Sequence, residues 1–395
     1  MMLYRKSLPG VVFLLLFMIS CSNSDFSEKN SLILFDLKEL REVTALKLSD
    51  LGAEEIEYIP LETCEQSVIS RISKIIVSSD FFLVVYSTDI YMFRHDGSFV
   101  RMLGAQGRGP GEFNVVHDID INPADENIYI VDGWQQKFFV FSVDGDLIRT
   151  FKSPVSAALN FRFTGDGILS YNQNHMGVIE NSFILFDTTG LVIRNFPNKY
   201  PWKRTVPNVA YQAENIFYKY NRQLFKKEIY CDTIFLYNNQ AFEPHAVIDI
   251  GSLRLTPEAR TEETGLFILH NFLVPMNLFE FGDYIFYEFI NPRIDESKKM
   301  AFIASKNDHF RAVIDSEQGL INDLDGGPDI SPRGVWDDNT LFTWVEAMDF
   351  KEWVKSEAFS HSQNRFPLKK AELEKLANSL KETDNPVLVL VRFEN

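Results

Sequence analysis

The sequence predicts an all-β protein, a six-bladed β-propeller of four-stranded antiparallel blades. The first indication is a repeated hairpin, because Gly97 and Gly145 each end an Asp-Gly pair between two apolar runs, and a third copy keeps Gly190. Asp-Gly supplies the positive φ values that a tight β-hairpin needs. The three glycines lie 48 and 45 residues apart, the length of a propeller blade.

Composition is the second indication. Hydrophobic residues make up 45% of the chain, with 35 Phe and 14 Tyr, and aromatic side chains favour strands over helices. Because each blade packs on its neighbours, 395 residues can form one large domain. The net charge of −16, with no cluster of Lys and Arg, argues against a nucleic-acid partner.

Five blades follow from short apolar runs separated by turn residues. The expected strands are 72–77, 81–86, 91–93 and 99–103 in the first blade; 116–121, 127–131, 138–141 and 147–151 in the second; 160–163, 168–171, 183–186 and 191–196 in the third; 216–220, 224–228, 233–237 and 246–250 in the fourth; and 276–281, 284–289, 300–305 and 310–314 in the fifth.

The last blade is expected to close the ring. After a strand at 341–347, residues 368–381 show the apolar spacing of a helix, and 387–393 form the final strand. This blade lacks a fourth strand, which the N-terminal run 56–61 can supply, and the pairing removes an exposed sheet edge. Repeat length alone would also allow seven blades, but the strand count favours six.

The N-terminus has the pattern of an export signal. Arg5 and Lys6 precede an apolar run, 8–19, that is too short to span a bilayer. The sequence Met18-Ile19-Ser20-Cys21 resembles a bacterial lipobox, in which the cysteine is acylated. An ordinary secretory peptide with an incidental cysteine is the alternative. We therefore expect a signal peptide at 1–20, a tether and extension at 21–42, and the propeller at 43–395, with the membrane as a partner through the lipid.

Cys64 and Cys231 are the remaining cysteines. An oxidising compartment would permit a disulfide, but the two residues belong to distant parts of the repeat. Buried or half-buried thiols are the favoured interpretation, with the bridge left open.

Several motifs resemble a known family. Residues 131–141 look like an NHL-type blade, and four separated motifs, at 59–63, 107–113, 325–327 and 385–387, resemble the six-bladed β-propeller lipoproteins of Bacteroidetes. The resemblance implies the propeller fold and an outer-membrane lipoprotein of the cell envelope, facing the periplasm or the cell surface. It implies no catalytic residues.

Two loops invite a ligand interpretation. The glycine-rich loop 107–113 lacks the Lys-Ser/Thr of a phosphate-binding loop and is interpreted as an inter-blade turn. The loop 322–329 carries Asp323 and Asp325 in spacing that hints at Ca²⁺, but the downstream glutamate of a calcium loop is missing. A structural turn is favoured, with a Ca²⁺ site as the alternative and no other cofactor expected.

A metal-dependent enzyme of the lyase or lactonase type is the weaker functional hypothesis. His117, Asp118 and Asp120 open the inner strand of the second blade, where they could face the central channel, with Asn160 and Asp323 as companions. No zinc motif, catalytic triad or nucleophile elbow is present in the sequence. Catalysis is therefore not favoured.

A binding or scaffolding module is the leading hypothesis. Loops around a propeller channel present aromatic and forked polar side chains, and the candidates are Arg108, Trp134, Trp202 and Arg204, the last two in the proline-rich insertion 196–204. Each of them could instead serve in packing. The ligand could be a carbohydrate, a peptide or another envelope protein.

Overall fold

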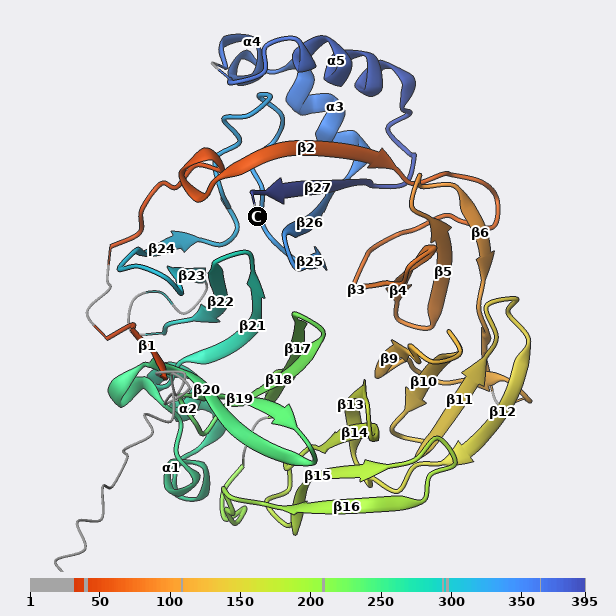
Figure 1. Cartoon of the computed structure of the whole chain (residues 1–395), viewed down its shortest axis with the longest axis vertical. Coiled ribbons are helices and arrows are strands. Elements are labelled where there is room, and N and C mark those ends of the chain that lie inside the picture. The colour runs from red at the N-terminus through yellow and green to blue at the C-terminus, as the bar shows by residue number, and fades with distance from the viewer. Residues whose placement is uncertain are drawn as a thin grey trace, which may run out of the picture. The chain divides into compact units, whose positions relative to one another are not determined.

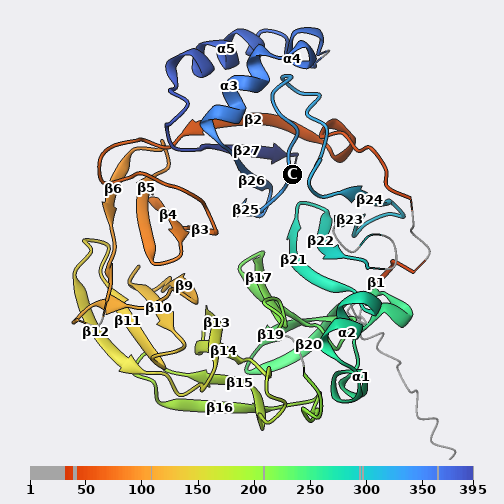
Figure 2. The same ribbon diagram turned by 180° about the vertical axis from the view of Figure 1, so that it is seen from behind.

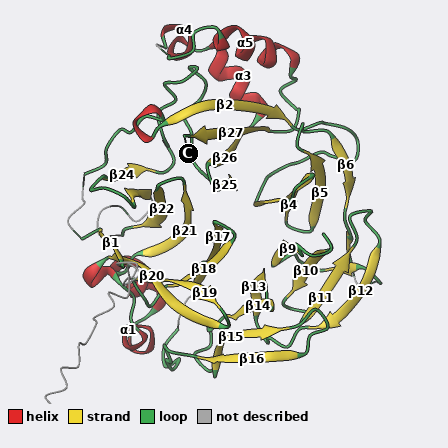
Figure 3. Ribbon diagram, in the orientation of Figure 1, coloured by secondary structure: helices red, strands yellow, loops and turns green. Residues whose placement is uncertain are grey.

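The chain forms a ring of six β-sheets around a central axis. A computed structural model describes residues 32–38, 42–107, 109–207, 210–292, 295, 298–362 and 364–394. Within the compact unit Ile33–Asn395, successive sheets follow one another round the ring (Figure 1), and the same order is seen from behind (Figure 2). Strands make up the ring itself, while helices lie at its periphery (Figure 3). The predicted six-bladed propeller is confirmed.

Five blades are continuous in sequence, each running from an inner to an outer strand. Their strands are β3 (Lys74–Val77), β4 (Phe81–Tyr86), β5 (Asp89–Arg94) and β6 (Phe99–Met102) in blade 1; β9 (Asp118–Ile121), β10 (Ile128–Asp132), β11 (Lys137–Phe141) and β12 (Leu147–Lys152) in blade 2; β13 (Ala158–Thr164), β14 (Gly167–Asn172), β15 (Asn181–Phe186) and β16 (Val192–Pro197) in blade 3; β17 (Asn215–Tyr220), β18 (Gln223–Glu228), β19 (Thr233–Asn238) and β20 (Ala241–Asp249) in blade 4; and β21 (Val274–Phe281), β22 (Tyr284–Ile290), β23 (Lys299–Ser305) and β24 (Arg311–Asp315) in blade 5.

Blade 6 closes the ring in the predicted way. Its strands are β25 (Gly334–Asp337), β26 (Thr340–Val345), β27 (Val387–Phe393) and the N-terminal β2 (Ala53–Pro60). β2 pairs antiparallel with β27, placing Ile56 opposite Val391. Both ends of the propeller therefore share one sheet, so that neither end leaves a strand unpaired.

A second N-terminal strand was not anticipated. β1 (Ile33–Asp36), within the expected extension 21–42, adds to blade 4 as a fifth strand that runs parallel to β20. Phe35 is fully buried and meets the ring of Phe302 edge-on, with the centroids 6.1 Å apart. β1 thus covers the outer edge of blade 4, and burial of Phe35 stabilises it there by about 2 kcal/mol.

Helices occupy the connections rather than the blades. The predicted helix in the last blade is α5 (Lys369–Ser379), and α3 (Ala347–Lys355) and α4 (Glu357–His361) precede it in the same insertion. α1 (Pro257–Glu262) and α2 (Gly265–Asn271) join blades 4 and 5, and the 3₁₀ turns η1 (Ser49–Leu51) and η2 (Gly251–Leu253) precede β2 and α1. None of the described helices is both long and apolar enough to cross a bilayer.

Aromatic packing between blades forms much of the core. The ring of Phe138 in blade 2 stacks on Phe151 at 4.9 Å and meets Phe161 and Phe186 of blade 3 edge-on at 5.0 and 5.6 Å. Offset and edge-to-face pairs add about 0.5 to 1.5 kcal/mol each to the burial of their surface. These contacts fix each blade against its neighbour.

In the repeated turn, only the glycine of each Asp-Gly pair has a positive φ. Gly97, Gly145 and Gly190 have φ values of 83°, 85° and 93°. At Gly97 a Cβ atom would lie 2.3 Å from the carbonyl oxygen of Pro60, so the turn of blade 1 lies directly against the closing strand β2. Between blades 1 and 2, β7 (Ala105–Gln106) precedes the loop 107–113 and pairs in parallel with β8 (Glu112–Phe113) at its end, which fits an inter-blade turn. Cys64 and Cys231 are both free thiols.

Candidate functional site in the central channel

A pocket of about 220 Å³ opens where the inner strands of five successive blades converge. The polar residues that line it on these strands are Lys74 of β3, Asp118 of β9, Asn160 and Arg162 of β13, and Asn215 of β17, and Met276 of β21 lines it as well. Each lies within the first five residues of its strand. The inner strands surround the axis of the ring (Figure 1), and the pocket lies among the first residues of five of them, toward one end of that axis.

Asp118 is the electrostatic centre of the pocket. Its side chain is 1% exposed and forms ion pairs with Lys74 of blade 1 and, at 2.7 Å, with Arg162 Nη1 of blade 3. Asp118 Oδ2 also accepts the backbone N–H of Phe161 at 2.9 Å. Burial acts to raise the pKa of Asp118, but the two cations outweigh it and hold that pKa below its usual value. The carboxylate therefore stays ionised and joins three blades.

Asp120 repeats this arrangement further along β9. Its Oδ2 accepts the backbone N–H of Phe163 at 2.9 Å and lies 3.2 Å from Lys219 Nζ of β17. Both carboxylates thus bind backbone donors of β13 across the blade interface. Each carboxylate already has a cationic side chain as its partner, so a metal ion would have to displace that partner to bind there.

Two asparagines in the pocket are incompletely hydrogen-bonded. Asn160 Nδ2 donates to the backbone carbonyl oxygen of Asn215 at 3.0 Å. Its own Oδ1 and both polar side-chain atoms of Asn215 have no partner among the described residues, although Asn215 is only 2% exposed. A buried polar group without a partner costs about 1 to 3 kcal/mol. Such groups in a native fold call for a ligand or an ordered water.

His117 brings a neutral hydrogen-bond donor to the pocket. Its Nδ1 accepts the backbone N–H of Gly133 at 3.0 Å, so the proton of the neutral ring lies on Nε2. Burial lowers the pKa of His117 below its usual value despite the nearby carboxylates of Asp132 and Asp118. The ring is therefore uncharged at neutral pH.

Trp134 stands beside this histidine. Its ring meets His117 edge-on, with 5.1 Å between centroids, and the residue is 76% exposed. Asp132 Oδ1 fixes the turn by accepting the backbone N–H of Trp134 at 3.0 Å. An exposed aromatic face thus lies next to the His117 side of the pocket.

The structure brings together only part of the predicted set of site residues. His117, Asp118 and Asn160 line one pocket, with Asp120 further along β9 and Trp134 against His117. The expected companion Asp323 does not join them, because its carboxylate accepts both the backbone N–H and the hydroxyl of Ser49. Arg108 and Cys21 lie outside the described residues.

Trp202 and Arg204 lie away from the channel pocket. Trp202 is 5% exposed, in an apolar cluster with Tyr211, and the guanidinium of Arg260 lies 4.9 Å from its ring centroid. Arg204 is exposed, and its Nη1 lies 3.2 Å from Met176 Sδ. The insertion therefore carries one packing residue, Trp202, and one accessible cation.

The loop 322–329 is held by its own hydrogen bonds. Asp325, fully buried, accepts at Oδ1 from Asn322 Nδ2 at 2.8 Å, from the backbone N–H of Gly327 at 2.9 Å and from the Tyr58 hydroxyl at 3.2 Å. Burial raises the pKa of Asp325. The hydrogen bonds of Asp325 within the loop favour a structural turn. The described residues contain no group of three or more His, Cys, Asp or Glu arranged to hold a metal ion.

Among the polar residues that line the pocket on the inner strands, sequence reasoning missed Lys74, Arg162 and Asn215. Lys74 and Asn215 occupy the first position of an inner strand, as Asp118 does, and Arg162 lies two residues beyond Asn160. The strand-start position was therefore the available signal. The expected metal site included only carboxylate, amide and histidine side chains near strand starts, and it left out the lysine and arginine there.

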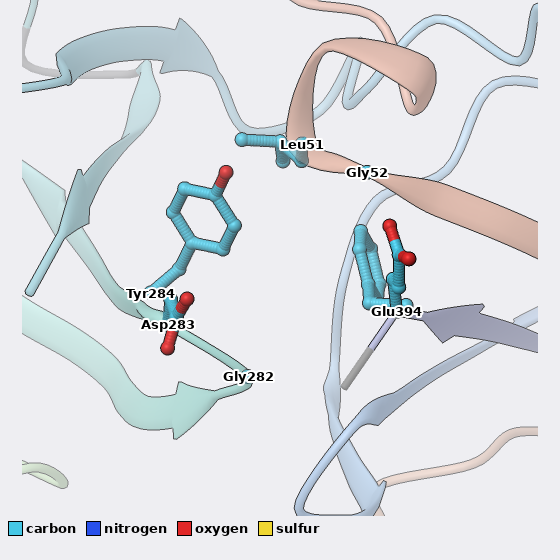
Figure 4. A pocket seen from close by; sticks show the side chains of 7 residues that line it. Leu51, Gly52, Gly282, Asp283, Tyr284 and Glu394 are labelled. Atoms are coloured by element: carbon cyan, nitrogen blue, oxygen red, sulfur yellow. The ribbon is translucent and has the colours of Figure 1, made fainter. Parts of the chain in front are cut away.

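A second pocket, of about 200 Å³, lies where blade 5 meets the closing blade (Figure 4). Leu51 of η1 and Gly52 line it just before β2, Asp283 and Tyr284 line it where the β21–β22 turn enters β22, and Glu394 lines it just after β27. Asp283 and Glu394 are exposed, and none of the pocket's lining residues contributes a buried side-chain atom without a hydrogen-bond partner. This pocket lies at a boundary between two blades and has fewer features of a binding site than the channel pocket.

The fold and the channel pocket define a six-bladed propeller with a polar site at its centre. The family model described as "Domain of unknown function (DUF4934)" matches residues 32–392, so the chain belongs to that family. No curated protein matches the sequence.

Comparison with solved structures finds similar chains at low sequence identity. A presumed exported protein of Bacteroides fragilis NCTC 9343 is 16% identical, with a TM-score of 0.69 over 92% of this chain and all of that one. A member of the DUF4221 family from Bacteroides vulgatus is 12% identical, with a TM-score of 0.48 over 87% of this chain and 97% of the other. Virginiamycin B lyase of Staphylococcus aureus is 12% identical, with a TM-score of 0.37 over 66% of this chain and 74% of the other. The first likeness shows a common fold.

Proposed function

We propose that this protein is a lipid-anchored propeller of the cell envelope that binds a polar ligand, foremost a carbohydrate, in its central channel. The observation that carries the proposal is Asn215, a 2%-exposed side chain in the pocket whose amide oxygen and nitrogen both lack a partner among the described residues. Such a side chain is costly unless something binds it. A pocket of about 220 Å³ is smaller than the sites of drug-sized ligands, so it would take one end of a larger molecule.

Binding is favoured over metal-dependent catalysis by the state of the two channel carboxylates. Asp118 is paired with Lys74 and Arg162, and Asp120 with Lys219. A divalent cation at either carboxylate would have to displace these partners and would meet their positive charge. Binding requires no such rearrangement.

The envelope location rests on the sequence around Cys21. A single acyl chain gives only marginal membrane binding, whereas several chains, each contributing about 0.8 kcal/mol per buried CH₂, anchor a protein stably. A Cys21→Ala variant should shift the protein from the membrane fraction to the soluble fraction, with Cys64→Ala as the matched control. Equal solubility of the wild type and the Cys21 variant would refute the anchor.

The ligand proposal is tested by thermal-shift and calorimetric titration of the full chain with neutral monosaccharides and oligosaccharides, sugar acids and short peptides. We expect a carbohydrate to raise the melting temperature, and Asn215→Leu to remove that shift. Asn195→Leu is the control, because Asn195 is exposed on the outer strand β16. If every probe leaves the melting temperature unchanged, the binding function is wrong.

A further inference from the structure

We infer that the end group held in the channel pocket is an anion, the carboxylate of a sugar acid. The inference rests on the proposed binding function and specifies the chemical class of its ligand. It depends on the charges, free donors and aromatic surface that the pocket brings together.

The charged residues that line the pocket do not balance. Lys74 and Arg162 share one carboxylate, Asp118, while the chain as a whole has a net charge of −16. Nearby, Lys219 is matched by Asp120. A carboxylate entering the pocket would therefore meet one unit of positive charge in excess, in a partly buried place where solvent screens it less than at the surface.

Asp132 is the other acidic group near this side of the pocket. Its charge acts to raise the pKa of His117, and the residue is fully buried. Its oxygens accept from the backbone N–H groups of Asn114, Trp134 and Gln135 and from Gln135 Nε2. Asp132 does not line the pocket, and its oxygens are held by these four donors. The excess of one positive charge therefore refers to the residues that line the pocket.

Arg162 retains unused donors suited to a carboxylate. Within the described structure its Nη1 donates to Asp118 and to the backbone carbonyl of Phe161, and no bond is made by Nε or Nη2. Arginine donors lie in a planar fork that matches two carboxylate oxygens. With side chains 15% and 33% exposed, both Arg162 and Lys74 remain reachable.

The neutral groups favour a sugar as the body of this anion. Asn160 Oδ1 needs a donor, while the Asn215 amide needs both a donor and an acceptor. A hydroxyl serves as either, so neighbouring hydroxyls of a sugar ring satisfy these amides in either orientation of the Asn215 side chain. The exposed ring of Trp134, beside the neutral His117, adds an aromatic face on which a sugar can lie.

The inference is tested by calorimetric titration of the full chain with galacturonate and glucuronate, in parallel with galactose, glucose and glutarate. At neutral pH and low salt we expect each hexuronate to bind at least tenfold more tightly than its hexose. We also expect this advantage to shrink in 0.5 M salt, because the pocket is partly open. Glutarate, which has carboxylates but no hydroxyls, should bind more weakly than the hexuronates.

Variants separate the charge from the rest of the site. Arg162→Gln should reduce hexuronate affinity at least tenfold, to about that of the hexose, and Lys74→Gln should act in the same direction. Arg194→Gln, on the exposed strand β16, is the control. Because Arg162 also pairs with Asp118, the affinities of the Arg162 variant are measured at a temperature where its melting curve shows that it is folded. If the Arg162 variant does not fold, the Lys74 variant provides the test.

The outcomes distinguish the inference from the proposed function. Equal affinity for hexuronates and hexoses, or an advantage that survives both Arg162→Gln and Lys74→Gln, would overturn the inference and leave carbohydrate binding intact. Tighter binding of glutarate or of an acidic peptide than of any sugar would replace the sugar acid with another carboxylate ligand. If neither sugars nor acids bind, both the inference and the proposed binding function fail.

Discussion

The Asn160 side chain of blade 3 donates a hydrogen bond of 3.0 Å to the backbone carbonyl oxygen of Asn215 in blade 4. This bond joins the inner strands of two blades at the pocket wall. It uses one donor of the pair and leaves the remaining side-chain polar atoms of both residues without partners in the described structure. The two asparagines therefore differ in what their removal should do.

Asn215→Leu should be nearly neutral for stability, within about 1 kcal/mol, because it replaces an unpaired buried amide by an apolar group of similar size. Asn160→Leu should cost about 0.5 to 1.5 kcal/mol, because it removes the bond to the Asn215 carbonyl. Urea denaturation of both variants checks the difference. A loss on Asn215→Leu as large as that on Asn160→Leu would show that the Asn215 amide is satisfied in the folded protein.

Asp118→Asn should destabilise the protein by about 3 kcal/mol at neutral pH, because it leaves Lys74 and Arg162 facing each other without a counter-charge. The estimate takes the lower end of the range for a broken buried pair, because the Lys74 side chain is 33% exposed and water replaces part of the lost interaction. The free energy of unfolding checks it, with Asp144→Asn, 77% exposed, as the control.

The pH dependence of stability should follow the same carboxylate. The pKa of Asp118 is lower in the folded protein than its unfolded value of about 3.9. As the pH falls, Asp118 takes up its proton in the unfolded chain at a higher pH than in the folded protein. The stabilisation by the ionised carboxylate is therefore complete above about pH 4 and is lost as the pH falls through the folded pKa. Between pH 5 and pH 2, the wild type should lose more stability than Asp118→Asn. Parallel curves for the two proteins would contradict this prediction.

Trp202→Ala should cost about 3 to 5 kcal/mol, because the residue is 5% exposed and packs against Tyr211 and Arg260. Trp134→Ala, at a 76%-exposed position, should change stability by less than about 0.5 kcal/mol and weaken ligand binding instead. Thermal melts with and without ligand separate the two effects. If Trp202→Ala melts like the wild type and binds no ligand, Trp202 is a binding residue.

Deletion of residues 387–395 should abolish cooperative unfolding, because β27 is the strand to which both β2 and β26 pair. The loss exposes the edges of two strands and separates the ends of the ring. The control is Arg392→Ala, which removes only an exposed ion pair with Glu55 and should cost less than about 1 kcal/mol. A truncated protein that melts within a few degrees of the wild type would show that closure contributes little.

The secondary structure that was predictable came from local patterns. Asp-Gly turns and alternating apolar runs placed the hairpins, and the apolar spacing around Leu373 and Ala377 placed α5. The start of α1 has a local signal as well. Thr256 and Pro257 form a cap and first residue for α1, and the Thr256 hydroxyl accepts the N–H of Ala259 at 3.2 Å. β1 has a short apolar run, but a four-residue strand is stabilised by the edge it covers, and the run does not indicate that edge.

The candidate site was predictable only in part. The residue types alone marked four of its residues as candidates: His117, Asp118, Asn160 and Trp134. Their roles could not be predicted, because these depend on neighbours from other blades. Asp118 was considered as a metal ligand, yet it is neutralised by Lys74, 44 residues earlier, and by Arg162, 44 residues later. Such partners lie a blade away in sequence, and only the closed ring brings them to one carboxylate.

The sequence by itself determined most of the blade strands, the blade repeat and the closing pair β2–β27, because periodicity, turn chemistry and strand count are properties of neighbouring residues and of their order. The tertiary structure alone decided which side chains share the channel. It placed Asn215 in the pocket without partners, and it buried Trp202 under Arg260. The physical reason is that burial, charge balance and hydrogen-bond satisfaction depend on atoms from several blades at once, which the spacing of residues along one blade does not specify.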